Sequence, residues 1–515
     1  MALTTRHAVG VAHVQMKHTS GRQYRWSNVF FIMVMSLGSL GYGLSTAIIG
    51  TTLAQPFFFE YFELEGRPDL ERIISLCVGL YQAGGFCGSI ICPLLADKWG
   101  RKTAIISASV VVIITGALLC GSVNIGMFIA MRFFNGIGAL ALLVLIPVWM
   151  AEVAPPSVRG AMVVMHGVMI GLGYTAAQWI AYGFFHVHNN LSWRLPLLLQ
   201  CIPLVFLIAS MPWIPESPRY LLMVDNVDNA TKVIRRLHHP EEATVELAQM
   251  TRQVAIDRTL DSSWIQMFKK PSYRKRSLMA LVLASSTQMV GVLVISNYGP
   301  TIYKQLGFDA DLQFIFQSAT IMAGFFASPI AIWIVDRMPR NILLGACELG
   351  CVACLLVEAA LDATMPEQHN IAGLRASVAM LFLFFMLFNG GVDCSVYPYL
   401  TEIFPTHLRV KGMSLAVSGI CVTDLLWLML APTAFASIGW KYYLCFIIPA
   451  FVMALCILLF FPDTSGVPLE EIAAIFGDQD ELYRGNYEGG KDAIADEERS
   501  SAQHIESDVE GKVDV

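Results

Sequence analysis

Apolar runs of about twenty residues, repeated from one end of the chain to the other, constrain this sequence more than any other feature. A helix of about twenty apolar residues is long enough to cross the hydrocarbon core of a bilayer. Of the 515 residues, 55% are hydrophobic and only 14% are charged, whereas soluble domains are roughly 25% charged. A single soluble core stops growing near roughly 250–300 residues, so it cannot bury this much apolar sequence. We therefore predict an all-α integral membrane protein.

Twelve runs reach the length of a membrane span. The predicted spans are 28–49, 73–95, 103–122, 125–148, 160–184, 194–213, 277–300, 313–335, 342–361, 376–400, 412–434 and 441–461. Lysine and arginine concentrate in the connections that follow even-numbered spans, and the positive-inside rule places such connections in the cytoplasm. This orientation puts both termini in the cytoplasm. No small-residue cleavage site precedes the first span, so we expect it to remain as an anchor.

The spans divide the chain into two six-helix halves with three polar segments. The expected segments are a cytoplasmic N-terminal segment 1–26, a first half 27–213, a cytoplasmic linker with short surface helices 214–276, a second half 277–461 and an acidic cytoplasmic tail 462–515. The chain has no basic groove for nucleic acid. Its cysteines lie inside apolar runs without the spacing of metal ligands, so we expect no metal and no cofactor. No nucleophile–base pair or phosphate loop indicates an enzyme, and because one chain supplies both halves, we expect a monomer surrounded by lipid.

Three charged motifs recur in the same order at the cytoplasmic ends of spans in both halves. The first pairs an aspartate with an arginine four residues later, and the second pairs a glutamate with an arginine seven residues later. The third is a proline followed by a carboxylate at the end of each half. The members are Asp97, Arg101, Glu152, Arg159 and Glu216 in the first half, and Asp336, Arg340, Glu402, Arg409 and Asp463 in the second.

The positive-inside rule accounts for the arginines of this set but not for the carboxylates. Opposite charges at a half-desolvated helix end attract more strongly than at a wet surface. We therefore interpret the set as a cytoplasmic gate network, which joins the helices while the pore faces outward and breaks when it faces inward.

With these motifs the chain resembles the sugar porter family of the major facilitator superfamily. The sequences of its motifs are most similar to those of fungal members. The resemblance covers about Gly41 to Phe476. The matching motifs are Asp97-x-x-Gly-Arg-Lys102, Arg132-x-x-x-Gly136-x-Gly138, Pro147-x-x-x-x-Glu152-x-x-Pro155, Arg159-Gly160, Pro215-Glu-Ser-Pro-Arg219, Tyr298 with Pro300, Glu402-Ile-Phe-Pro405, Arg409-x-Lys-Gly412 and Pro462-Asp-Thr-x-Gly466.

The resemblance implies a major facilitator fold and alternating access around a solute site near the midplane of the membrane. It also implies a transporter of a sugar, a related polyol or a cyclic polyhydroxy acid, with the plasma membrane as the default location and an internal membrane as the alternative. The alternative is a nutrient sensor of the same family that binds solute without carrying it. Such sensors usually have very long cytoplasmic tails, and a tail of about 50 residues speaks against this alternative.

The departures from the family pattern lie where the solute would bind. The glutamine of span five is replaced by Gly167, and the paired glutamines of span seven are Thr287 and Gln288. In span ten a Gly-Pro stretch is replaced around Asp393, and the usual tryptophan is Tyr397. A hexose and a related compound are therefore both candidates for the solute.

Sugar recognition needs amides and hydroxyls that donate and accept hydrogen bonds, beside an aromatic face. A buried amide in a span is costly unless it is used. The candidate solute-binding residues are His166, Gln178, Gln288, Asn297, Tyr298, Asn389 and Tyr397. For each of them, helix packing or a hydrogen bond between helices is the structural alternative.

Proton-coupled members of the family carry an aspartate in span one that is partnered by the arginine of span four. Here Gly43 takes the place of the aspartate while Arg132 remains, which favours facilitated diffusion. Asp393 and Asp424 lie within spans and must be paired, hydrated or protonated there. They are the alternative sites for a coupled proton, and pairing with a neighbouring helix is the structural alternative for both.

Overall fold

The computed structural model describes residues 26–155, 159–237, 240–305, 308–335, 337–364, 371–464 and 475–476. Twelve helices in this part are long and apolar enough to cross a membrane. The chain is therefore an all-α multi-pass membrane protein with the predicted number of spans. Asp336, almost all of the predicted N-terminal segment and most of the acidic tail lie outside the described residues.

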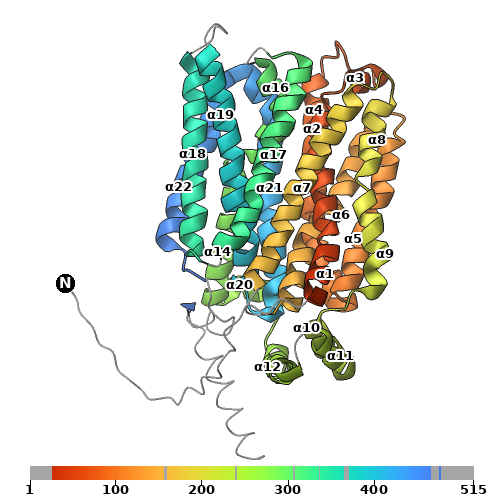
Figure 1. Ribbon diagram of the computed structural model, residues 1–515, viewed down its shortest axis with the longest axis vertical. Coiled ribbons are helices and arrows are strands. Elements are labelled where there is room, and N and C mark those ends of the chain that lie inside the picture. Colours follow the sequence, from red (N-terminus) through yellow and green to blue (C-terminus); the bar gives the residue numbers. More distant parts are fainter. Residues whose placement is uncertain are drawn as a thin grey trace, which may run out of the picture.

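Two bundles stand side by side in Figure 1, one drawn in red to yellow and the other in green to blue. The first bundle contains α1 (Trp26–Met35), α2 (Leu37–Thr52), α3 (Pro56–Tyr61), α4 (Leu70–Trp99), α5 (Arg101–Cys120), α6 (Ile125–Val153), α7 (Arg159–Phe185), α8 (Leu191–Leu199) and α9 (Ile202–Ser210). The second contains α14 (Pro271–Met289), α15 (Val292–Asn297), α16 (Gly299–Gln305), α17 (Ala310–Ile334), α18 (Arg340–Thr364), α19 (Ile371–Leu387), the π-helical turn η3 (Phe388–Asp393), α20 (Cys394–Ile403), α21 (Arg409–Ile438) and α22 (Tyr442–Phe460).

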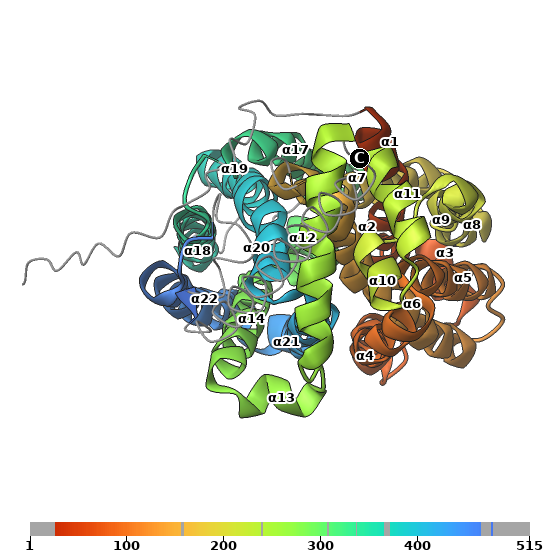
Figure 2. The same ribbon diagram turned by 90° about the horizontal axis from the view of Figure 1, so that it is seen from below.

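Four short helices of the linker lie beneath the two bundles, as Figure 2 shows from below. They are α10 (Pro218–Met223), α11 (Val227–Leu237), α12 (Pro240–Thr259) and α13 (Trp264–Lys269). The bundles themselves meet mainly through α4 against α21 and α7 against α17. Large apolar side chains such as Phe206 and Phe460 are exposed on the outer helices, where lipid would cover them.

Two spans of the second half are irregular near their middle. The helix of span seven stops at Met289 and resumes at Val292, because Gly291 between them adopts a left-handed conformation with φ +72°. In span ten the π-helical turn η3 separates α19 from α20. Broken helices and π-helical turns inside membrane spans are typical of binding sites.

Gly136 on α6 is one of the glycines that allow close packing of α4 against α6. A Cβ at this position would overlap the backbone carbonyl oxygen of Tyr81 on α4. Gly84 and Gly88 on α4 approach the backbone of α6 in the same way. Backbone atoms cannot move aside as a flexible side chain can, so the contact of α4 with α6 requires that residue 136 has no side chain.

We expect Gly136→Ala to lower the stability of the detergent-purified protein by about 1–3 kcal/mol, the usual cost of overpacking a buried contact. Its melting temperature, followed by tryptophan fluorescence, measures this loss. Gly183→Ala is the matched control, because nothing lies within 4 Å of a Cβ built there. Equal melting temperatures for the two variants would show that α4 and α6 can separate without loss.

Candidate solute-binding site

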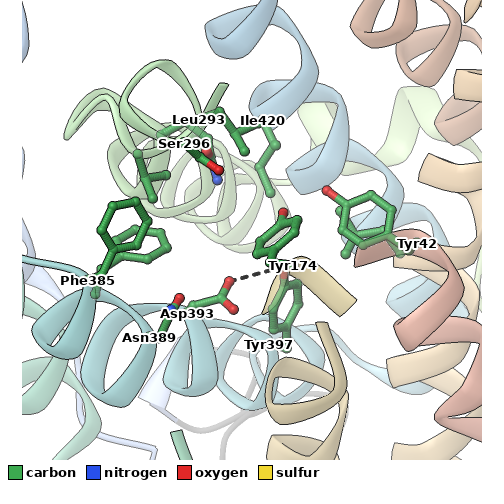
Figure 3. A pocket seen from close by; sticks show the side chains of 13 residues that line it. Tyr42, Tyr174, Leu293, Ser296, Phe385, Asn389, Asp393, Tyr397 and Ile420 are labelled. Atoms are coloured by element: carbon green, nitrogen blue, oxygen red, sulfur yellow. Dashed lines mark hydrogen bonds between the residues drawn. The ribbon is translucent and has the colours of Figure 1, made fainter. Parts of the chain in front are cut away.

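A cavity lies between the two halves near the middle of the spans (Figure 3). It has room for about one or two water molecules but not for a sugar ring. The lining residues are Tyr42, Leu143, Tyr174, Gln288, Val292, Leu293, Ser296, Phe385, Phe388, Asn389, Asp393, Tyr397 and Ile420. The structure therefore holds its central cavity in a tightly closed state.

The break in span seven positions one wall of the cavity. Gln288 occupies the last turn of α14, and its backbone carbonyl accepts a hydrogen bond from the Gly291 amide at 2.9 Å. The side-chain Nε2 of Gln288 donates to Thr287 Oγ1 at 3.2 Å, while Oε1 has no partner among the described residues. The helix then restarts so that Val292, Leu293 and Ser296 face the same cavity. A polar amide acceptor thus remains available to a ligand.

The π-helical turn positions the opposite wall. Phe385, Asn389, Asp393 and Tyr397 line the cavity at intervals of four residues. In a regular α-helix each such step turns about 40° further around the axis, because one turn takes about 3.6 residues. The wider π-helical turn offsets this drift, so all four side chains share one face. The Tyr397 hydroxyl lies 3.5 Å from Asp393 Oδ1.

The first half contributes Tyr42 from α2, Leu143 from α6 and Tyr174 from α7. The sequence interpretation missed both tyrosines as solute-site residues. A signal was present, since Tyr174 lies four residues before Gln178 and eight after His166, on the same face of one helix.

Four of the residues singled out from the sequence line the cavity, namely Gln288, Asn389, Asp393 and Tyr397. His166 stands directly behind the cavity wall. Its ring meets the edge of Tyr397 with 4.6 Å between ring centroids, and its Nδ1 shares a 2.7 Å hydrogen bond with Ser39 Oγ.

The other residues predicted to bind solute lie outside the cavity in this state. Gln178 is buried, and its amide has no hydrogen-bond partner among the described residues. Asn297 donates to the backbone carbonyl of Leu293 at 2.9 Å, within its own helix. Tyr298 donates to the carbonyl of Leu428 on α21 at 3.3 Å, the interhelical role that was its structural alternative.

The candidate coupling residues occupy three different places. Asp393 lines the cavity, while Asp424 is buried in α21 outside it, in electrostatic contact with Tyr42. Arg132 is buried in the first half, where it donates to the carbonyls of Cys77 and Ser45, both at 3.2 Å.

No carboxylate accompanies Arg132 in the described part of the chain. Its guanidinium instead lies over the ring of Tyr81, 4.3 Å from the centroid. Gly43, in the aspartate position of proton-coupled members, faces α7 so closely that a Cβ would overlap the carbonyl oxygen of Ile170. An acidic side chain at this position would require α2 and α7 to separate.

The charged motifs of the first half come together at the end of the bundle that lies next to the linker helices. Arg101 lies 3.3 Å from Glu152 and 3.7 Å from Asp97. The Ser217 hydroxyl donates to Glu152. Burial raises the pKa of Glu216, although the backbone amides of Ser217 and Lys102 donate to its carboxylate at 2.9 and 3.2 Å.

The second half repeats this arrangement with a buried pair. Arg340 forms an ion pair with Glu402, and their side chains are only 3% and 9% exposed. The Thr464 hydroxyl donates to the same carboxylate at 3.1 Å, and Asp463 accepts the backbone amide of Arg340 at 3.1 Å.

The two halves are in contact on the side of the linker. Lys411 on α21 lies 3.3 Å from Asp97 on α4 and donates to the Ser262 carbonyl of the linker at 2.7 Å. Ser414 donates to the carbonyl of Ser89 across the same interface. Arg409, buried beside Arg159 and Arg219 as well as Glu152, donates to the Thr401 carbonyl at 2.9 Å. The sequence interpretation did not include Lys411 among these charges, although it stands in the Arg-x-Lys-Gly motif.

We expect Lys411→Met to raise the apparent KM for uptake by about two- to fivefold. An ion pair of this exposure contributes roughly 0.2–1 kcal/mol, and its loss favours the state that is open to the cytoplasm. Lys441→Met, an exposed lysine at the other end of α21, is the control. An unchanged KM in both variants would remove Lys411 from the gate.

The chain is similar in sequence to known transporters. The family model described as "Sugar (and other) transporter" matches residues 31–476. The MFS-type transporter criB of Aspergillus cristatus is 29% identical over 462 residues, which cover 88% of this chain and 95% of that protein. The low-affinity glucose transporter HXT3 of Saccharomyces cerevisiae is 27% identical, over 87% of this chain and 81% of that one. These relatives are transporters and not enzymes.

Solved structures share the fold. The proton:xylose symporter XylE bound to 6-bromo-6-deoxy-D-glucose superposes with a TM-score of 0.78 at 22% identity, covering 88% of this chain and 100% of that one. The inward-open conformation of the xylose transporter XylE from E. coli gives a lower TM-score of 0.68, at 20% identity over 87% of this chain and 99% of that one. The described spans therefore form a major facilitator fold.

Proposed function

We propose that this chain, which belongs to the sugar transporter family, carries a sugar or a related polyhydroxylated solute across the plasma membrane by alternating access. Both termini then lie in the cytoplasm, and the linker helices α10–α13 lie on that side. The charged motifs at the ends of the spans act as the cytoplasmic gate network, and a single chain is the working unit.

The observation that carries this proposal is the central cavity. Both halves line it, and its second-half wall forms where spans seven and ten depart from regular helix. Its polar groups are few and its aromatic walls are broad, which is the usual composition of a small-molecule site. Because the cavity is nearly closed, solute must enter as one half tilts away from the other.

Uniport is favoured over proton symport. The arginine of span four has only neutral partners among the described residues, so this place lacks a carboxylate that could exchange a proton. Asp393 and Asp424 are the remaining carboxylates near the cavity.

The test is uptake of labelled hexoses, disaccharides, polyols and quinate-like acids into cells that lack their own carriers, with and without a protonophore. Uptake that persists with the protonophore supports uniport. Uptake that the protonophore abolishes contradicts uniport and makes Asp393 and Asp424 the candidates for binding the coupled proton. No uptake by protein that reaches the surface contradicts transport and favours the nutrient sensor.

A further inference from the structure

Asp393 is the one formally charged residue among those that line the cavity. Its side chain is buried, and the only hydrogen bond recorded for it among the described residues is the long contact of 3.5 Å from the Tyr397 hydroxyl. An ionised carboxylate removed from water is costly unless a cation or several strong donors compensate it. The Asp393 carboxylate is therefore a hydrogen-bond acceptor in the cavity that requires a cation or strong donors as partners.

No lysine, arginine or histidine belongs to the lining of the cavity in the described part of the chain. The nearest imidazole, His166, lies behind the Tyr397 ring and bonds to Ser39. The buried Arg132 is bound to carbonyls on α2 and α4, outside the lining. The carboxylate of Asp393 would thus repel an anionic solute, and no positively charged side chain of the described lining would offset this repulsion.

Aromatic rings enclose the carboxylate. Tyr174 and Tyr397 lie on one side of Asp393 in Figure 3, and Tyr42, Phe385 and Phe388 complete the aromatic part of the lining. The faces of aromatic rings attract cations, and such enclosures recognise ammonium groups in proteins. A carboxylate within an aromatic enclosure thus combines two features that both favour positive charge.

We propose that Asp393 and the surrounding tyrosines select a solute with a protonated amino group, such as an amino sugar, and reject solutes with a carboxylate. This proposal rests on the proposed transport function and names the solute class of the same cavity. The ammonium group lies against Asp393, while the hydroxyls of the solute reach Gln288 and Asn389. The ring of the solute packs against the phenylalanines.

The experiment measures uptake of four labelled compounds that share one carbon skeleton: glucosamine, glucose, N-acetylglucosamine and gluconate. At pH 6 the amine of glucosamine is charged. Glucose is the uncharged compound of similar size, whereas acetylation removes the charge and also adds a bulky acetyl group. We expect the apparent KM for glucosamine to be at least about tenfold lower than for glucose or N-acetylglucosamine, with no uptake of gluconate.

Each of the other outcomes contradicts the charge preference, the role of the solute in neutralising Asp393, or transport itself. Equal KM values for glucosamine and glucose, or uptake of gluconate, contradict the charge preference while leaving sugar transport intact. Preferred uptake of glucose that a protonophore abolishes shows that a proton, and not the solute, neutralises Asp393. Uptake of none of the four, with protein at the surface, contradicts transport and the charge preference together.

Variants then assign the preference to a residue. Asp393→Asn is expected to reduce the ratio of the two KM values to about one, because the amide has no negative charge. Glu348→Gln, which removes a buried carboxylate of α18 outside the lining, is the matched control and is expected to keep the ratio. A ratio that survives Asp393→Asn would exclude Asp393 as the determinant. The four-compound series in the unmodified protein decides the charge preference even if this variant fails to reach the surface.

Discussion

Arg340→Met is expected to lower the free energy of unfolding by about 3–5 kcal/mol, the usual cost of removing one partner of a buried ion pair. The methionine is apolar and leaves the carboxylate of Glu402 in a buried place with the Thr464 hydroxyl as its remaining recorded partner. Protein purified in detergent and followed by tryptophan fluorescence should melt several degrees below the unmodified protein.

Two further variants separate the lost ion pair from other effects of this substitution. Arg337→Met removes an exposed arginine from the same connection and should change stability by less than about 0.5 kcal/mol. The double variant Arg340→Met with Glu402→Leu should recover most of the loss, because an apolar pair of similar volume can replace a buried ion pair. A double variant no more stable than Arg340→Met alone would contradict this explanation.

Gln288→Leu is expected to lower the efficiency of solute uptake by about a hundredfold. The substitution removes the free amide oxygen at the break of span seven while keeping the size of the side chain. A solute hydroxyl that enters the closed cavity without its partner costs roughly 1–3 kcal/mol, and about 2.7 kcal/mol corresponds to a hundredfold. The ratio kcat/KM for uptake into proteoliposomes measures the loss directly.

Gln178→Leu provides the comparison for this prediction. Gln178 is also a buried glutamine in a span, but it lies outside the cavity and makes no recorded hydrogen bond. We expect its KM for uptake to remain within about threefold of the unmodified value. A hundredfold loss in Gln178→Leu would show that span five binds solute in another state of the transport cycle.

The pattern of spans could be predicted because it is a local property of the chain. The apolar length that crosses a bilayer is contained in each run by itself, and the repeated charged motifs mark the two halves without reference to contacts. Even so, the ends of spans were less accurate. The second span was predicted at 73–95, whereas α4 extends over Leu70–Trp99, since polar and charged residues continue a helix at the membrane surface.

The cavity could be predicted only in part. Gln288, Asn389, Asp393 and Tyr397 stood out because a polar residue within an apolar run has few structural uses. Tyr42, Phe385 and Phe388 did not stand out, because an aromatic residue in a span is equally suited to lipid, to helix packing or to a solute. Lys411 was missed from the gate network for a related reason, since a lysine at a cytoplasmic helix end already satisfies the positive-inside rule.

The sequence by itself determined the membrane fold, the twelve spans, the duplicated halves and the family to which the chain belongs. Only the tertiary structure decided which face of each span reaches the cavity. Helix rotation and depth depend on packing with neighbours, so Tyr174 lines the cavity while Gln178, one turn away, does not. The break at Gly291 and the π-helical turn at Phe388–Asp393 likewise turn side chains by amounts that no regular periodicity in the sequence contains.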